Sequence, residues 1–259
     1  LIDSDNILPS RDWLKRMIEP LEADQRLIGS EPIEYTYRPS DPPLTRYCAL
    51  MGMNDPLVYF LGNYDRKNVL SGKWTEAPVK EITNDKSQKT KRYRVVELDP
   101  KNLPTIGANG TVMRRSVLQS VVGNNLYLFD IDEVAKLAAL GQSRFAKVEI
   151  GIIHLYAGSL SQFARKQLRR VRDYLYFRAS GIRKFTWGGP QAWRKVYFIL
   201  ACLTVVPLLY QSAKGYRRKP DSVWLLHPIY CWITLLVYGW GFLSYRLKPG
   251  LASRANWKQ

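Results

Sequence analysis

The sequence contains few of the residues that build disulfide scaffolds and zinc sites. Three cysteines (Cys48, Cys202 and Cys231) and two histidines occur among 259 residues, and no pair of cysteines has the spacing of zinc ligands. A disulfide-rich secreted scaffold is therefore excluded. Acidic residues are scarce in one region only: positions 161–259 contain 18 Lys and Arg but two Asp, whereas positions 1–160 contain 21 basic and 20 acidic residues.

The composition narrows the class of protein further. A net charge of +17 with 46% hydrophobic and 12% aromatic residues excludes a disordered polycation, and the length suffices for one large or two small domains with a buried core. The nearly neutral first 160 residues argue against a nucleic-acid-binding protein. The chain begins at Leu1, with neither an initiator Met nor a signal peptide, so we expect it to start inside a longer protein.

Two long apolar runs, Val196–Ala213 and Ser222–Leu243, contain no formally charged side chain. A bilayer core requires about 20 such residues per helix, so we expect two transmembrane helices joined by the short loop Lys214–Asp221. Such a hairpin returns the tail to the side of the globular part. A pair of buried core helices is the alternative, and Pro207 leaves a re-entrant or tilted first helix open.

A basic helix is expected just before these runs, over Ser161–Arg178. Its apolar side chains recur at helical spacing, at Ala164, Leu168, Val171 and Leu175, and its remaining surface is crowded with Arg and Lys. This pattern is typical of a helix lying in the headgroup layer, although a solvated helix packed on the domain has it too. Ten basic residues from Arg165 to Lys195 favour a cytoplasmic globular domain and contact with anionic lipid.

The first 160 residues alternate between strand and helix patterns. The polar stretch Asn63–Lys91 predicts a mobile loop or an acceptor-side insertion. Strands are expected at Glu34–Arg38, Arg92–Leu98 and Val148–Tyr156. Helices are expected at residues 13–21, at Leu44–Met53, at Thr111–Val122 and from about Asp132 to Ala139. Gly141 follows the last of these and is expected to terminate it.

Three short motifs carry candidate chemistry. Asp3-Ser-Asp5 follows the strand stub Leu1–Ile2, and two carboxylates in one turn can bind a hard cation, although a solvated turn has the same pattern. The glycines of Gly107-Ala-Asn-Gly110, followed by Arg114-Arg115, allow close approach of backbone to a ligand or simply form a turn.

The third motif is Phe129-Asp-Ile-Asp132-Glu133. Asp130 and Asp132 can serve as a general base and its structural partner, or they can stabilise a helix N-terminus. His154 is a lone histidine in an apolar run, which favours a hydrogen-bonded core residue over a ligand.

In this order, the motifs together with the basic helix and the apolar runs resemble a family 2 glycosyltransferase, specifically the membrane-anchored inverting enzymes with a GT-A catalytic domain. The resemblance covers residues 1–178. It implies an α/β fold in which the C-terminal part of a GT-A (Rossmann-like) glycosyltransferase domain is followed by a basic amphipathic helix and a two-helix transmembrane hairpin. The corresponding segments are 1–160 for the catalytic portion, 161–195 for the interfacial segment, 196–245 for the two spans and 246–259 for a basic tail.

The resemblance also implies roles for single residues. Asp3 and Asp5 match the family's Asp-x-Asp, which holds a divalent metal (Mg²⁺ or Mn²⁺) on the donor diphosphate, with Asp5 the closer ligand. Gly107, Asn109 and Gly110 match the turn that lines the donor-sugar and acceptor pocket.

Asp130 matches the base that deprotonates the acceptor hydroxyl. Phe129 stands where the family has Glu, so Asp132 is the fallback. Gln167-Leu-Arg-Arg170-Val171 resembles the Gln-x-x-Arg-Trp of processive synthases, but Val171 replaces Trp, which argues against a polymerising enzyme. Arg169 and Arg170 are then expected to meet a pyrophosphate or a lipid phosphate.

The implied activity is transfer of a sugar, of the hexosyltransferase type, from a nucleotide-sugar donor to a lipid-linked or envelope-glycan acceptor by metal-assisted inverting displacement. The expected partners are the donor, the acceptor and membrane lipids, with no nucleic acid. The family's first βα units precede Asp-x-Asp, so we expect this chain to lack much of the nucleotide site, and the fragment alone need not be active. The alternative is a non-catalytic membrane module, a decayed relative that binds anionic lipid through residues 161–195.

Overall fold

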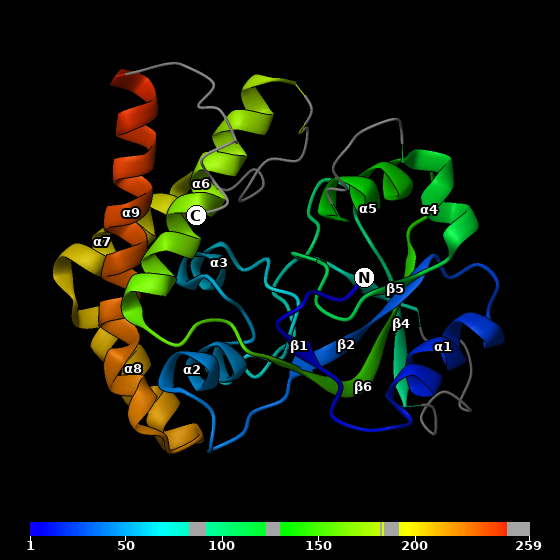
Figure 1. Ribbon diagram of the computed structural model, residues 1–259, viewed down its shortest axis with the longest axis horizontal. Helices are drawn as coiled ribbons and strands as arrows, with labels where there is room; N and C mark the ends of the chain where they lie inside the picture. The colour runs from blue at the N-terminus through cyan, green and yellow to red at the C-terminus, as the bar shows by residue number, and fades with distance from the viewer. Residues whose placement is uncertain (83–91, 123–129, 182, 184–191, 248–259) are drawn as a thin grey trace.

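The computed structural model describes residues 1–82, 92–122, 130–181, 183 and 192–247. It is a mixed α/β structure with one mixed sheet (Figure 1). The strand order is β3-β4-β6-β2-β5, and β1 pairs with the end of β6. Only β2 and β6 run parallel among the described pairs. The strands are β1 (Asn6–Ile7), β2 (Gly29–Tyr35), β3 (Lys80–Glu81), β4 (Tyr93–Glu97), β5 (Val112–Met113) and β6 (Arg144–His154).

The long central strand β6 confirms the buried strand predicted at Val148–Tyr156, although it begins four residues earlier. The strand predicted at Arg92–Leu98 is also confirmed, as β4. The strand predicted at Glu34–Arg38 is shifted, because β2 begins at Gly29 and ends at Tyr35. Its residues are buried almost throughout, so they lack the polar–apolar alternation by which a half-exposed strand is recognised.

Helices cover both faces of the sheet. Alternate β6 residues, from Ala146 to Ile152, pack with Trp13 and Met17 of α1 (Trp13–Ala23). Phe145 points to the other face and packs with Val134 of α5 (Asp130–Ala139). The start of α5 and the positive φ of 81° at Gly141 confirm the predicted helix and its glycine terminator. The helix predicted at Thr111–Val122 is shorter, because residues 112–113 pair with β2 before α4 (Arg115–Val121) begins.

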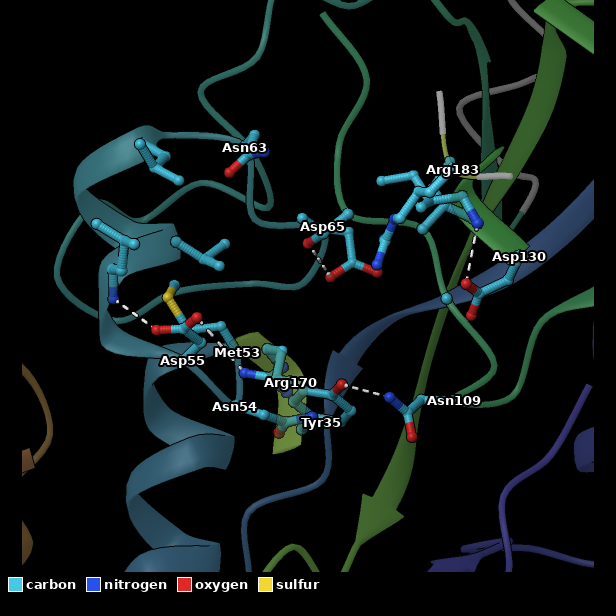
Figure 2. A pocket seen from close by; sticks show the side chains of 17 residues that line it. Tyr35, Met53, Asn54, Asp55, Asn63, Asp65, Asn109, Asp130, Arg170 and Arg183 are labelled. Carbon is cyan, nitrogen blue, oxygen red and sulfur yellow. Dashed lines mark hydrogen bonds and ion pairs between the residues drawn. The ribbon is translucent and has the colours of Figure 1, made fainter. Parts of the chain in front are cut away.

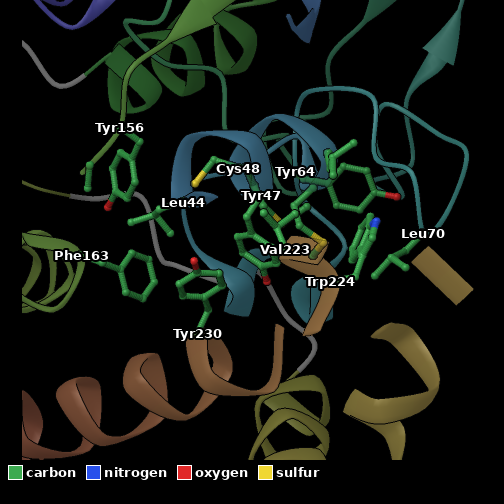
Figure 3. Close-up of a cluster of buried hydrophobic side chains, with 14 residues drawn as sticks. Leu44, Tyr47, Cys48, Tyr64, Leu70, Tyr156, Phe163, Val223, Trp224 and Tyr230 are labelled. Atoms are coloured by element: carbon green, nitrogen blue, oxygen red, sulfur yellow. The ribbon is translucent and has the colours of Figure 1, made fainter. Parts of the chain in front are cut away.

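A second core joins the sheet-bearing part to the later helices. It lies between α2 (Pro43–Met51), α6 (Leu160–Ala179) and the 3-10 helix η2 (Ser222–Leu226) with α9 (His227–Leu247). Figure 3 shows Tyr47, Trp224, Tyr230 and Phe163 in this cluster. The ring centroids of Tyr47 and Tyr230 are 4.4 Å apart and those of Phe163 and Tyr230 are 5.5 Å apart.

The apolar seam predicted for the basic helix is confirmed at Val171 and is displaced by one residue at its other three positions. Ala164, Leu168 and Leu175 are only half-buried, whereas α6 buries the stripe Phe163, Gln167, Val171, Tyr174 and Phe177. The interface is filled mainly by aromatic side chains and a hydrogen-bonded glutamine. A prediction based on the spacing of aliphatic residues does not detect either.

The first apolar run does not form one straight helix. It breaks at Val205, whose φ is 62°, into α7 (Ala192–Thr204) and α8 (Val206–Arg218), which are bent by 89°. Pro207 lies in the first turn of α8, where proline starts a helix readily. The second run lies in one helix, Ser222–Leu247. Among the described residues, this is the one helix that is long and apolar enough to cross a membrane. The bent pair α7–α8 is a second candidate if the two helices are counted as one span.

Candidate active site

A cavity of about 280 Å³ opens at the carboxyl end of β2, where Tyr35 forms part of its wall. Figure 2 shows its polar residues on two sides: Asp130 with Arg183, and Asp55 with Arg170. The remaining wall comes from α3 (Pro56–Leu61) and from the segments around Asp65 and Gly107. The carboxyl edge of parallel strands is the usual position of ligand sites in α/β proteins.

The predicted turn Gly107–Gly110 forms part of the cavity wall through Gly107 and Asn109. A Cβ on Gly107 would lie 3.2 Å from Oδ2 of Asp130, so glycine lets the backbone approach this carboxyl group. Gly110 has φ +84°, and a Cβ there would meet Cδ1 of Ile152 at 2.6 Å. Both glycines are thus fixed by close packing rather than by turn geometry alone.

Asn109 connects this turn to its neighbours. Its Nδ2 donates to the hydroxyl of Tyr35 at 3.1 Å, and its Oδ1 accepts from Nδ2 of Asn6 at 3.2 Å. Its backbone carbonyl accepts from Arg66 at 3.0 Å. The amide side chain therefore holds the segment that contains Asp3 and Asp5 against the cavity wall.

Of the two predicted acidic residues on α5, Asp130 faces the cavity. Burial raises the pKa of its carboxyl, while hydrogen bonds from the backbone of Ile131 and Ala108 and the charge of Arg183 oppose the rise. Asp132 is buried beside Arg183, with 3.3 Å between the carboxylate and the guanidinium Nε. Asp132 is thus placed to position Arg183, and Asp130 is placed to meet a ligand.

Asp5 lies at the end of β6, next to the cavity wall. Its Oδ2 is 3.3 Å from Nε2 of His154 and 3.2 Å from Nζ of Lys166. Burial alone would raise its pKa, but the hydrogen bonds and charges of His154 and Lys166 lower it to about 2. The carboxylate is therefore ionised at neutral pH.

Asp3 is exposed. Its negative charge contributes to the rise in the pKa of Asp130. Within the described ranges, no group of three His, Cys, Asp or Glu side chains comes together as a metal site. A divalent cation at Asp3 and Asp5 would therefore take most of its ligands from a bound diphosphate and from water. These are the hard oxygen ligands that Mg²⁺ and Mn²⁺ accept.

The two predicted arginines of α6 are placed differently. Arg170 lines the cavity, 3.5 Å from Asp55 and 3.1 Å from the side-chain oxygen of Gln167. Arg169 has 64% of its side chain exposed and lies 3.7 Å from Asp173, one turn further along the helix. The structure thus brings Arg170, but not Arg169, to the cavity.

A buried cluster of charges behind the cavity has no counterpart in the sequence analysis. Glu31 accepts from Arg66 at 2.6 Å and from Lys147 at 2.5 Å, and all three side chains are fully buried. Asp65, which lines the cavity, pairs with Arg66. Burial and the charge of Glu31 raise the pKa of Asp65 to about 6, and Arg66 opposes the rise.

The mobile loop predicted at Asn63–Lys91 is wrong for its first part, because Tyr64, Asp65, Arg66 and Leu70 are buried. Residues 83–91 lie outside the described residues, as does Phe129. No spacing signal marks the cluster, since its four charges come from two strands and a loop that are distant in sequence. His154 is buried and hydrogen-bonded as predicted, but one of its partners is the candidate ligand Asp5.

Comparisons with protein-family models, with curated proteins and with solved structures find no match for this chain. The function is therefore inferred from the geometry of the cavity and from the charge and polarity of the surfaces around it.

Proposed function

We propose that the protein is a membrane-bound glycosyltransferase that moves a sugar from a nucleotide-sugar donor to a lipid-linked or envelope-glycan acceptor. The observation that carries the proposal is the position of Asp130, a buried carboxyl group that lies directly against Gly107 in the wall of a cavity lined by two arginines. The raised pKa of this carboxyl suits a general base, which works best when its pKa approaches the working pH.

Asp130 takes the proton of the acceptor hydroxyl as the hydroxyl attacks the anomeric carbon of the donor sugar. The carbon–oxygen bond to the diphosphate breaks on the opposite face, so the configuration inverts. Such a base contributes on the order of 10²–10⁴-fold to the rate. Asp132 holds the guanidinium of Arg183 beside the reacting carboxyl.

The leaving diphosphate needs positive charge around it. Arg170 and Arg183 both line the cavity, and charge-assisted hydrogen bonds from guanidinium groups bind phosphate well. Asp3 and Asp5, with His154 beside Asp5, would hold Mg²⁺ or Mn²⁺ on the diphosphate. The bound cation would supply charge neutralisation of the leaving group.

A lipid-linked acceptor is favoured by the apolar wall of the cavity. This wall is formed by Leu57, Val58 and Leu61 of α3. Phe60 of α3 packs on α7, where its ring centroid is 5.0 Å from that of Phe198. The polar and apolar walls together match a substrate with a phosphate and a hydrocarbon chain. We place the cavity on the cytoplasmic face, because ten basic residues precede the apolar helices and such residues favour the cytoplasmic side.

The test is release of nucleoside diphosphate from a panel of nucleotide sugars by the full-length protein in detergent, with Mg²⁺, Mn²⁺ or EDTA. We expect release from one donor, its loss in EDTA, and a decrease of at least about 10²-fold in Asp130→Asn. Asp12→Asn is the matched control, because Asp12 is exposed at the start of α1. Equal rates for Asp130→Asn and Asp12→Asn would remove Asp130 from the mechanism.

A second candidate is a non-catalytic module that binds anionic lipid. It is favoured by the exposed arginines on the outer side of α6, among them Arg165, Arg169 and Arg172. This candidate predicts no release from any donor together with binding to anionic vesicles that weakens with salt. The donor screen therefore separates the two functions.

A further inference from the structure

One side of the molecule exposes an extensive apolar surface. Among the residues that the structure describes, 24 large hydrophobic side chains are exposed, and 17 of them lie on α7, α8, η2 and α9. These helices are grouped together on one side in Figure 1, away from the sheet. Monomeric soluble proteins rarely expose contiguous apolar patches above a few hundred Å², so we expect something other than water to cover this face.

Both ends of the bent pair α7–α8 are bonded to the same stretch of the sheet-bearing part. At its start, Arg194 donates to the carbonyl of Leu61 at 2.8 Å. At its end, Arg218 donates to the carbonyls of Val69 and Leu70, each at 2.8 Å. The chain therefore leaves the domain, turns at Val205 and returns to the surface from which it started.

The lengths of the two helices agree with this path. Each contains 13 residues, and at about 1.5 Å per residue each is about 20 Å long. The hydrocarbon core of a bilayer is about 30 Å thick. Neither helix spans it, and the bend of 89° prevents the pair from acting as one straight span.

Helix α9 is long enough to span, but it is packed lengthwise on α6. The two helices run side by side in the same direction, with Phe163 against Tyr230 and Val171 against Gly241. Between these contacts, the hydroxyl oxygen of Tyr238 lies 3.0 Å from the side-chain oxygen of Gln167. These contacts extend from Tyr230 in the first turn of α9 to Gly241 beyond its middle, so α6 lies alongside most of the length of α9.

The outer side of α6 then decides where the membrane can be. Arg165, Arg169 and Arg172 are exposed there, alongside the first two thirds of α9. If α9 crossed a bilayer in this arrangement, these charged side chains would lie in hydrocarbon, where Arg is strongly disfavoured. A crossing α9 is therefore incompatible with the α6–α9 contact.

We infer that α7, α8 and α9 together form a monotopic face that enters one leaflet of a bilayer without crossing it. Basic residues at the edges of this face, Lys195, Arg217 and Arg246, are exposed and match anionic headgroups. Trp193, near the start of α7, and Tyr216, near the end of α8, are also exposed, and both residue types prefer the interfacial layer. The inference replaces the two-span hairpin expected from the sequence, and it does not depend on the proposed chemistry.

The test places single cysteines at Arg165, Arg217 and Gln259 of the full chain, by the substitutions Arg165→Cys, Arg217→Cys and Gln259→Cys. The native thiols at Cys48, Cys202 and Cys231 are buried, so the unsubstituted chain gives the background. A membrane-impermeant maleimide is applied to sealed vesicles before and after they are opened with detergent. We expect all three positions to react from the same side.

Two outcomes would overturn the inference. A transmembrane hairpin places position 217 on the side opposite to position 165, and a single crossing by α9 places position 259 opposite to position 165. A second measurement is flotation with phosphatidylcholine–phosphatidylglycerol vesicles. We expect the protein to float with them, and its complete recovery in the lipid-free fraction would also overturn the inference.

Discussion

The sheet-bearing part and the helices α7–α9 place polar and apolar side chains in opposite ways. Behind the cavity, Glu31, Arg66 and Lys147 are fully buried, whereas Leu236 and Trp240 of α9 are about 60% exposed. Buried charges persist where each finds a partner, and exposed apolar faces persist where something other than water covers them. One region is thus organised around an internal polar site, whereas the other exposes apolar side chains on its outer face.

The two regions are nevertheless parts of one packed body. The aromatic cluster of Tyr47, Phe163, Trp224 and Tyr230 is shared between them, and the hydroxyl of Tyr238 on α9 donates to Asp55 at the cavity at 2.5 Å. Attachment of the apolar face to a membrane therefore places the cavity at a fixed height above the lipid. This arrangement suits an acceptor that is itself held in the membrane.

The largest effect is expected from the buried charges. Glu31→Gln leaves Arg66 and Lys147 without their shared carboxylate, and breaking a buried pair costs about 3–5 kcal/mol. Glu34→Gln, three residues along β2, is the matched control, because Glu34 is 3.5 Å from Lys67 and both side chains are 44% exposed. Exposed pairs contribute about 0–1 kcal/mol. Denaturant unfolding in detergent measures both, and equal losses would contradict the contrast between buried and exposed charges.

The second effect concerns the apolar face. Leu236→Lys puts a charge on α9 where the side chain is 60% exposed, and Leu140→Lys does so after α5, where the side chain is 70% exposed. A Lys at the centre of a membrane helix costs about 2.5–3.5 kcal/mol, and each 1.4 kcal/mol is about tenfold in binding. We expect at least about tenfold weaker vesicle binding for Leu236→Lys and no change for Leu140→Lys. Similar weakening in both would show that net charge, rather than this face, determines binding.

A third prediction tests how closely α9 packs on α6. A Cβ on Gly241 would lie 2.5 Å from Cγ1 of Val171, whereas a Cβ on Gly239 would meet nothing within 4 Å. Overpacking costs about 1–3 kcal/mol, and alanine in place of glycine gains up to about 1 kcal/mol in a helix. Gly241→Ala should therefore lower the thermal unfolding temperature, and Gly239→Ala should raise it slightly. If both variants were stabilised, α9 would not be held against α6.

The sequence predicted the elements whose signal is local. The buried strand β6, the strand β4 and the helix that ends before Gly141 were predicted from a continuous apolar run, an alternation and a terminating glycine. The path of the first apolar run was only partly predicted. Pro207 marked a possible interruption, but the return of α8 to the domain depends on Arg218 and the carbonyls of residues 69–70, which are 148 residues or more away in sequence.

The candidate site divides in the same way. Gly107, Asn109, Asp130 and Arg170 were predicted from short motifs, and the structure brings them to one cavity. Asp65 and its buried partners were not predicted, because burial of a charge depends on partners that no spacing reveals. The role of His154 was judged from its apolar neighbours alone, and its contact with Asp5 arises only because β1 pairs with the end of β6.

The smallest effect is expected at Asp5. Its side chain is 30% exposed, which is intermediate between the fully buried charges behind the cavity and the exposed side chains of α9. Its pKa is lowered from 3.8 to about 2 by His154 and Lys166, against the effect of burial. A lowered pKa in the folded state means that the pairing stabilises the protein above about pH 4, and that this stability is lost as the pH falls towards about 2. Unfolding temperatures measured between pH 6 and pH 2.5 should therefore decrease less steeply in Asp5→Asn than in the unsubstituted chain.

The variant His154→Gln separates this effect from the general acid sensitivity of the protein. It removes the imidazole but leaves Asp5 and Lys166 in place, so the pKa of Asp5 should rise and the loss of stability should begin at higher pH. Partial solvent screening keeps the shift modest. If the acid profile were unchanged in both variants, Asp5 would not be paired in solution, and the cation proposed to bind there would meet a free carboxylate instead of displacing His154 and Lys166.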